Sequence, residues 1–126
     1  MQSKNCHCGN QTLLEKCCQP YINGIQKPKT AEQLMRSRYS AYVLANADYL
    51  VATTHLSTRK FHEKSDILYW AKSNKWQKLE VLESNENFVT FKAYYCNEDN
   101  ENQIHFEKSR FILENETWFY VDGEFL

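Results

Sequence analysis

Four cysteines near the start of the chain have the residue type and spacing of a metal site. Cys6 and Cys8 form one close pair, and Cys17 and Cys18 form a second pair after eight intervening residues. Zn²⁺ prefers four soft ligands in a tetrahedron, and two thiolate pairs brought together by a short turn supply that geometry. The spacing therefore predicts a closed site for a structural zinc ion.

Two other interpretations of these cysteines remain open. The thiols could stay reduced without a metal, or a disulfide could form among them, with a redox role as a minor variant. Against both, four of the five cysteines lie within thirteen residues, and the adjacent Cys17 and Cys18 would bridge only with strain. A closed all-cysteine zinc site leaves no open coordination position for catalysis. Cys96, alone in a strand-like run, is expected to be a buried apolar residue.

A second group of polar residues has the chemistry of a buried network or a pocket. Arg38 falls in the apolar arc of a predicted helix, and His105 and Glu107 share one face of a predicted strand. An unpaired guanidinium is costly to bury, so Arg38 must meet a carboxylate or several carbonyl groups. Glu107 is the expected carboxylate partner, with Asp66 and Asp122 as alternatives.

Two roles fit this group. In the structural interpretation, which is favoured, Arg38, Glu107 and neighbouring tyrosines form a satisfied network that holds a helix on a sheet. In the functional interpretation the same residues, with Tyr42, line a cavity, and His55 and His105 are its titratable members.

A long helix over residues 30–55 is predicted to position Arg38. Thr30-Ala31-Glu32-Gln33 has the form of a capping box, in which the threonine accepts from a backbone N–H and Gln33 reaches back. Arg36 and Tyr39 lie off the apolar stripe, so we expect them to face solvent and a partner. The stripe comprises Leu34, Met35, Ala41, Tyr42, Ala45 and Tyr49, and the opposite side comprises Arg36, Ser40, Val43 and Ala47.

A shorter helix and four strands are predicted after the long helix. The helix covers residues 67–74, and charged and apolar residues then alternate as in a strand over 76–82. Further strands are predicted over 88–96, 103–113 and 117–121, joined by polar turns. Helices followed by consecutive antiparallel strands indicate an α+β fold, with the helices packed on one face of a curved sheet.

The cysteine segment resembles the SEC-C motif, a short zinc-binding element found at the C-terminus of the SecA translocase and on many bacterial proteins. The match comprises the four cysteines and Gly9. It departs at His7, where proline is common, and at Asn10-Gln11, where the motif usually has Ser-Gly. Those positions belong to the turn and not to the ligands, so the resemblance implies a zinc knuckle over residues 1–24.

The rest of the chain resembles the YchJ-like family of small bacterial proteins. The matching runs are AEQLMRSRYSAY at 31–42, DYL at 48–50, TH at 54–55, EKSRF at 107–111 and WFYVDG at 118–123. The likeness therefore covers nearly the whole chain. It implies that residues 25–126 form a cone-shaped domain similar to nuclear transport factor 2, and it implies no particular activity.

Charge and hydropathy argue against several functions. A formal net charge of −1 argues against a protein that mainly coats nucleic acid or an anionic membrane. No apolar run approaches the roughly 18 residues needed to span a bilayer, and residues 1–20 lack the pattern of a signal peptide. We therefore expect a cytoplasmic protein with no membrane partner. Nucleic-acid binding is a third prediction, and its basic residues would be Lys4, Lys16, Lys27 and Lys29.

Two functions of different classes are predicted. The first is a cytoplasmic bacterial zinc-binding protein that acts as a non-catalytic adaptor for a protein or ribonucleoprotein partner. The alternative is a small-molecule-binding protein or enzyme that uses the pocket of the cone, which rests on fold analogy. A deep pocket in which Arg38, a histidine and a carboxylate converge would favour the alternative, whereas a filled core would favour the adaptor.

Overall fold

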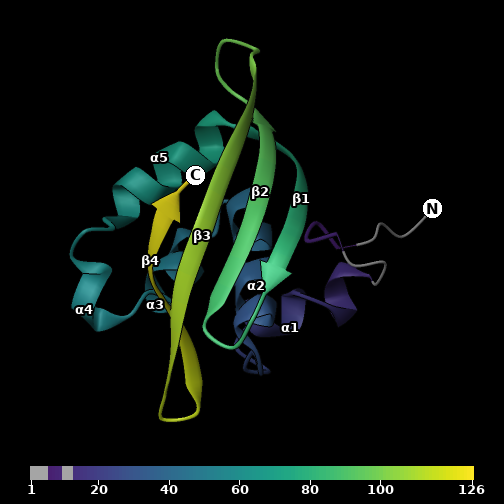
Figure 1. The fold of residues 1–126 in the computed structure, drawn as a ribbon. Coiled ribbons are helices and arrows are strands. Elements are labelled where there is room, and N and C mark those ends of the chain that lie inside the picture. The colour runs from purple at the N-terminus through teal and green to yellow at the C-terminus, as the bar shows by residue number, and fades with distance from the viewer. Residues whose placement is uncertain (1–5, 10–12) are drawn as a thin grey trace.

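The structure, a computed structural model, describes residues 6–9 and 13–126. Lys4 and the Asn10-Gln11 departure from the motif lie outside the described residues. A four-stranded antiparallel sheet forms one layer (Figure 1). Its strands follow the order of the sequence: β1 (Lys75–Ser84), β2 (Phe88–Cys96), β3 (Asn102–Glu114) and β4 (Thr117–Phe125). All four predicted strands are present, and β2 has the predicted bounds.

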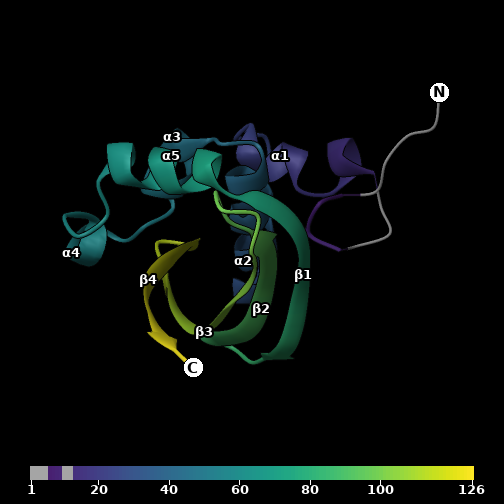
Figure 2. The ribbon, with the colours of Figure 1, turned by 90° about the horizontal axis from the view of Figure 1, so that it is seen from above.

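The sheet curls into a half-barrel whose concave face looks toward the helices (Figure 2). Bulges favour such bending: β1 has two register shifts against β2, and β3 has one against β4 between Arg110 and Phe111. Along β3, Glu107, Ser109 and Phe111 are buried while Lys108 is exposed, as the sequence alternation predicts. The polar residues predicted on this strand therefore lie on the side of the sheet that the helices cover.

Helices pack across the open side of this half-barrel (Figure 2). The longest is α2 (Ala31–Val43), which leads into α3 (Ala47–Ala52), and α5 (Lys64–Ser73) precedes the sheet. The described residues also form three single-turn elements: η1 (Leu14–Lys16), α1 (Gln19–Ile22) and α4 (Leu56–Arg59). The predicted α+β class, with helices on one face of a curved antiparallel sheet, is confirmed.

The predicted helix over residues 30–55 is wrong in its length, because α2 and α3 are separate. Ala45 adopts a φ of 55°, a left-handed conformation, and a right-handed helix cannot continue through it. Asn46 then begins α3, and its side-chain oxygen accepts from the Tyr49 N–H at 3.1 Å. The start of α2 agrees with the prediction, since the Gln33 N–H donates to Thr30 Oγ1 at 3.1 Å.

Helix α2 is buried on both sides, which the sequence periodicity did not predict. Leu34 and Ala41 are fully buried on the predicted apolar side, but Ser40, on the opposite side, is fully buried too. Tyr39 is also buried, and Arg36 is half-buried. The expectation that Arg36 and Tyr39 face solvent is wrong, because the cysteine-bearing segment covers that side of the helix.

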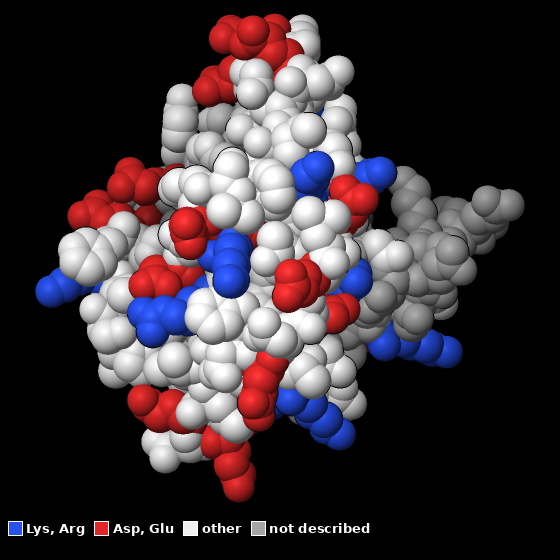
Figure 3. Space-filling model, in the orientation of Figure 1, with Lys and Arg blue, Asp and Glu red and all other residues white. Residues whose placement is uncertain are grey.

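The outer face of the sheet carries charges of both signs. Figure 3 shows Lys and Arg interspersed with Asp and Glu over this face, with acidic side chains gathered at the tip of the β2–β3 hairpin. Lys16, Lys27 and Lys29 are exposed. None of the described helices is both long and apolar enough to cross a membrane. The face shown lacks the one-sided basic surface that favours nucleic acid.

Candidate functional site

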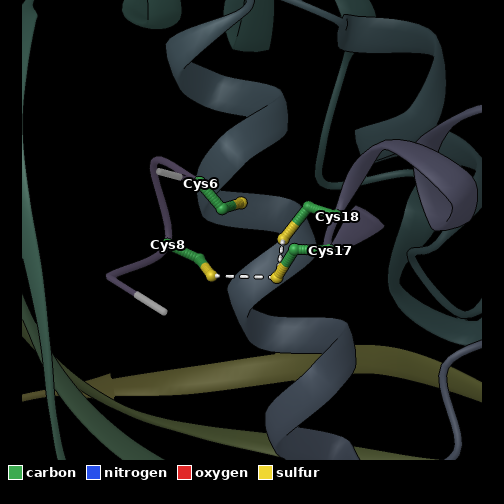
Figure 4. A group of neighbouring side chains, drawn as sticks. All are labelled: Cys6, Cys8, Cys17 and Cys18. Carbon is green, nitrogen blue, oxygen red and sulfur yellow. Dashed lines mark hydrogen bonds between the residues drawn. The ribbon is translucent and has the colours of Figure 1, made fainter. Parts of the chain in front are cut away.

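The four N-terminal cysteines converge beside α2 (Figure 4). Their sulfur atoms all lie within 4.8 Å of one another. The Sγ atoms of Cys8 and Cys17 are 3.7 Å apart, and those of Cys17 and Cys18 are 4.0 Å apart. Ligands at about 2.3 Å from a tetrahedral ion lie about 3.8 Å from one another. The cluster, which includes Cys6, therefore has the dimensions of a site for one soft metal ion.

Backbone geometry and one arginine hold the first cysteine pair in place. Gly9 has a φ of 97°, a conformation that favours glycine, and its N–H donates to the Cys6 carbonyl at 3.3 Å. From α2, Arg36 Nη1 donates to the Cys8 carbonyl at 2.7 Å, while its Nε donates to Glu32 at 2.9 Å. These contacts fix the turn that carries Cys6 and Cys8 against the helix.

The hydrogen bonds among the cysteines divide the cluster. Those from Cys18 and Cys8 lower the pKa of the Cys6 thiol below its usual value, whereas those with Cys6 and Cys8, together with burial, raise the pKa of Cys18. Four thiolates around a divalent ion leave a local charge of about −2. The positively charged Arg36, which donates to the Cys8 carbonyl, lies beside this charge. The sequence did not assign Arg36 to this site. Lys16, which directly precedes Cys17 in the sequence, is exposed. Cys96, expected to be buried, is only half-buried, at the end of β2 and outside the cluster.

A cavity of about 550 Å³ lies between the concave face of the sheet and the helices α2 and α5. Much of its wall is aromatic, and the rings of Trp70 and Trp76 meet nearly edge to face with centroids 4.9 Å apart. A mostly apolar cavity with a few converging polar groups is the usual form of a ligand site. The lining residues with polar side-chain groups include Arg38, Tyr39, Tyr42, His62, His105, Glu107, Ser109 and Tyr120.

Arg38 joins α2 to the end of α3 and to β4. Its Nη1 donates to the Leu50 carbonyl at 2.9 Å and to Thr53 Oγ1 at 2.6 Å. The same nitrogen lies 3.4 Å from Thr54 Oγ1, and the guanidinium carbon lies 4.5 Å from the centre of the Tyr120 ring. Arg38 thus meets a carbonyl, two hydroxyls and an aromatic face, all of them neutral.

The expected ion pair of Arg38 is wrong for each predicted partner. Among the described residues, no carboxylate lies within 4.0 Å of its guanidinium nitrogens, so neither Glu107 nor Asp66 nor Asp122 pairs with it. Asp122 instead pairs with Arg110 at 2.9 Å on the outer face. The reason is geometric: Arg38 points at the end of α3, which the single-helix prediction did not place beside it.

Glu107 is the centre of a buried hydrogen-bond network. Its oxygens accept from His105 Nε2 at 2.7 Å, from Ser109 Oγ and from Tyr120 Oη at 3.2 Å. Burial alone would raise the pKa of Glu107, but hydrogen bonds from His105 and Ser109 outweigh it and hold the pKa below its ordinary value. Gly123 lies directly against this carboxylate, since a Cβ at that position would collide with it.

The chain is similar to a known family over most of its length. Residues 30–123 match the family described as YchJ, middle NTF2-like domain. The chain belongs to the YchJ-like family. A UPF0225 protein from Vibrio parahaemolyticus is 42% identical over a 129-residue alignment that covers 98% of this chain and 76% of that protein. A UPF0225 protein from Serratia proteamaculans is 39% identical, with 94% and 81% covered.

Two solved structures show the same fold with the cysteine segment included. A SEC-C motif containing protein from Rhodopseudomonas palustris is 30% identical with a TM-score of 0.89, covering 98% of this chain and 99% of that one. A second such protein, from Psychrobacter arcticus, is 29% identical with a TM-score of 0.76, covering 97% and 81%. The predicted resemblance to the YchJ-like family and to SEC-C proteins is confirmed.

In this YchJ-like cone the predicted polar residues do not all lie together. His55 is outside the cavity, where its Nδ1 accepts from the Ser57 N–H at 3.1 Å and its Nε2 lies 3.0 Å from Glu114. It therefore begins α4 and ties it to the sheet. The residues that the cavity brings together are Arg38, Tyr42, His105 and Glu107.

Several residues of the site were missed by sequence reasoning. Ser109 follows Glu107 by two positions, and strand alternation places it on the same face, but it was not assigned to the site. Tyr120 and Gly123 lie on β4 and reach Glu107 only through the strand register, in which Ser109 pairs with Gly123. His62 lies between α4 and α5, and nothing in its local sequence distinguishes it.

Proposed function

We propose that the protein is a cytoplasmic, zinc-containing protein that binds a small molecule in the cavity of its cone. The observation that carries this proposal is the cavity of about 550 Å³ in which Arg38, His105 and Glu107 converge. Ligand cavities typically enclose about 300–1,000 Å³. A reducing compartment is proposed because the cysteine cluster needs its thiols unoxidised to bind metal.

Occupation of the cavity can be tested with an apolar fluorescent probe. Phenylnaphthylamine is neutral and becomes brighter in apolar surroundings, so we expect saturable binding of about one probe per chain. Ala93→Leu should weaken binding, because Ala93 lines the cavity and the larger side chain would occupy it. Lys108→Leu adds the same side chain on the outer face of the neighbouring strand and should leave binding unchanged. Equal binding by both variants would contradict the proposal.

The zinc ion is proposed to be structural. Four convergent cysteines, three of them buried, would fill all four coordination positions of a zinc ion and leave none open to a substrate. Metal analysis of the reduced protein should find about one zinc per chain. Cys8→Ser should lose the zinc and Cys96→Ser, outside the cluster, should keep it. Reduced wild-type protein without zinc would contradict this assignment.

An adaptor for a protein or ribonucleoprotein partner is the second candidate. Its support is an exposed apolar pair around α4, since Leu56 is 73% exposed and Phe61 is 71% exposed. Complementation of cells that lack the protein distinguishes the two candidate functions. Ala93→Leu should fail to restore the lost phenotype if ligand binding is the function, whereas Leu56→Ser with Phe61→Ser should fail if the adaptor role is.

A further inference from the structure

The cavity contains a buried positive charge that makes no ion pair with the described residues. Arg38 is only 8% exposed, and its three hydrogen bonds all use Nη1. No carboxylate of the described residues lies within 4.0 Å of it. In the described part of the chain every fully buried side-chain nitrogen or oxygen has a partner. Because Nε and Nη2 have none, they must reach accessible space, and the cavity is the space that Arg38 lines.

Neutral neighbours compensate this charge only in part. The Tyr120 ring, 4.5 Å from the guanidinium carbon, and the Leu50 carbonyl attract a cation without cancelling its charge. A guanidinium removed from bulk water gains most from an anion that accepts two parallel N–H bonds. The two unused groups, Nε and Nη2, are the pair that forms this fork.

The other charged group of the cavity is already satisfied. Glu107 is ionised, but its oxygens accept from His105, Ser109 and Tyr120. A cationic ligand would have to displace or crowd these donors. His62 adds no charge at neutral pH, because burial and the charge of Arg38 lower its pKa and outweigh the opposing effect of Glu107. The charged group with hydrogen-bonding atoms still open to a ligand is therefore Arg38.

A further donor lies in the same cavity. The Tyr42 hydroxyl has no hydrogen-bond partner among the described residues, and burial raises the pKa of Tyr42, so it remains protonated. A protonated phenol can donate to an anion. Beside it, the rings of Trp70 and Trp76 lie 5.8 and 5.6 Å from the Tyr42 ring. These three residues offer an aromatic wall next to the charged end of the cavity.

We infer that the cavity selects a small organic anion with an aromatic body, with Arg38 binding the anionic group and the Trp70–Trp76 wall packing on the rings. This inference rests on the proposed function, because it names the class of ligand for the same cavity. Arg38 is the specificity-determining residue, and Tyr42 is the second donor to the anionic group.

Two fluorescent probes that differ in one group test this selectivity. Anilinonaphthalene sulfonate and phenylnaphthylamine share their rings, and only the first carries an anionic group. We expect the sulfonate to bind at least about tenfold more tightly, since a hydrogen-bonded charge pair contributes about that factor or more. Equal affinities would overturn the inference while the proposed function stood, and failure of both probes to bind would overturn both.

Variants assign the selectivity to Arg38. Arg38→Met should remove the preference for the sulfonate and leave the affinity for the neutral probe within about twofold, whereas Arg38→Lys should keep part of the preference. Arg110→Met is the matched control, because Arg110 is exposed on the outer face and pairs with Asp122. Loss of sulfonate binding in Arg110→Met would show surface binding and overturn the inference.

If the Arg38 variants do not fold, competition experiments on the wild-type protein test the same selectivity for anions. Naphthoate, naphthamide and naphthylmethylammonium share one ring system and carry a negative, a neutral and a positive group. Naphthoate should displace phenylnaphthylamine at concentrations at least about tenfold lower than either of the others. If the amide or the ammonium compound competes as well as the acid, the cavity does not select anions.

Discussion

At the scale of single residues, Glu107 concentrates the polar chemistry of the cone. It is 6% exposed yet ionised, because three side-chain donors converge on it. Glu107→Gln removes the negative charge that accepts these hydrogen bonds and leaves an amide N–H₂ group facing the donors. We therefore expect the variant to lose about 1–3 kcal/mol of unfolding free energy at pH 7, measured by urea denaturation.

The same carboxylate makes a pH-dependent contribution to stability. The folded pKa of Glu107 lies below its ordinary value of 4.5, so its contribution is present at neutral pH and is lost as pH falls through the folded pKa. The stability difference between wild type and Glu107→Gln should thus be constant above about pH 5.5 and shrink below about pH 4.5. A difference that grows on acidification would show that Glu107 is held protonated.

Gly123 is a second residue whose role depends on Glu107. A methyl group at this position would meet the Glu107 side chain, so Gly123→Ala should cost about 1–3 kcal/mol of stability. The double variant Gly123→Ala with Glu107→Ala provides the control, because the obstacle is then gone. It should be no less stable than Glu107→Ala alone, and an added loss in the double variant would place the strain elsewhere.

At the scale of elements, local sequence signals predicted where the longer helices and the strands occur, but they did not predict the break between α2 and α3. The cap at Thr30 gave the correct start of α2, the composition of 88–96 gave the correct bounds of β2, and the alternation along β3 gave its buried face. The end of α2 could not be predicted, because alanine favours helix and Ala45 leaves it only under tertiary constraint. That one error also misplaced the hydrogen-bond partners of Arg38, which lie at the end of α3 and directly after it.

The left-handed Ala45 gives a test at this scale. Glycine adopts a φ of 55° without the steric cost that alanine has, so Ala45→Gly should raise stability by about 0.5–1 kcal/mol. The matched control is Ala52→Gly, in the last turn of α3 with ordinary helical geometry, which should lower stability by a similar amount. Destabilisation by both variants would show that the α2–α3 break does not depend on this conformation.

At the scale of the whole molecule, the cysteine segment and the cone share one core. Cys6, Cys8 and Cys18 pack in the same buried cluster as Leu34 and Leu79, residues of α2 and β1. Sequence spacing predicted the cluster of four cysteines because all four lie within thirteen residues of the chain. It could not show that the segment would cover the Arg36 side of α2, because that contact joins residues 28 positions apart.

Because this core is shared, metal removal should destabilise the entire protein and not only its front segment. We expect chelation of the reduced protein to lower the midpoint of the main thermal transition by about 5–15 °C, measured by calorimetry. The contact of Cys6 Sγ with Ser40 Oγ at 3.5 Å and the Arg36 bond to Cys8 transmit the loss to α2. Cys8→Ser should already show the lowered midpoint and should not respond to chelator, whereas Cys96→Ser should behave as wild type. A main transition that stays in place while a separate, earlier one appears would instead divide the molecule into two independent units near residue 24.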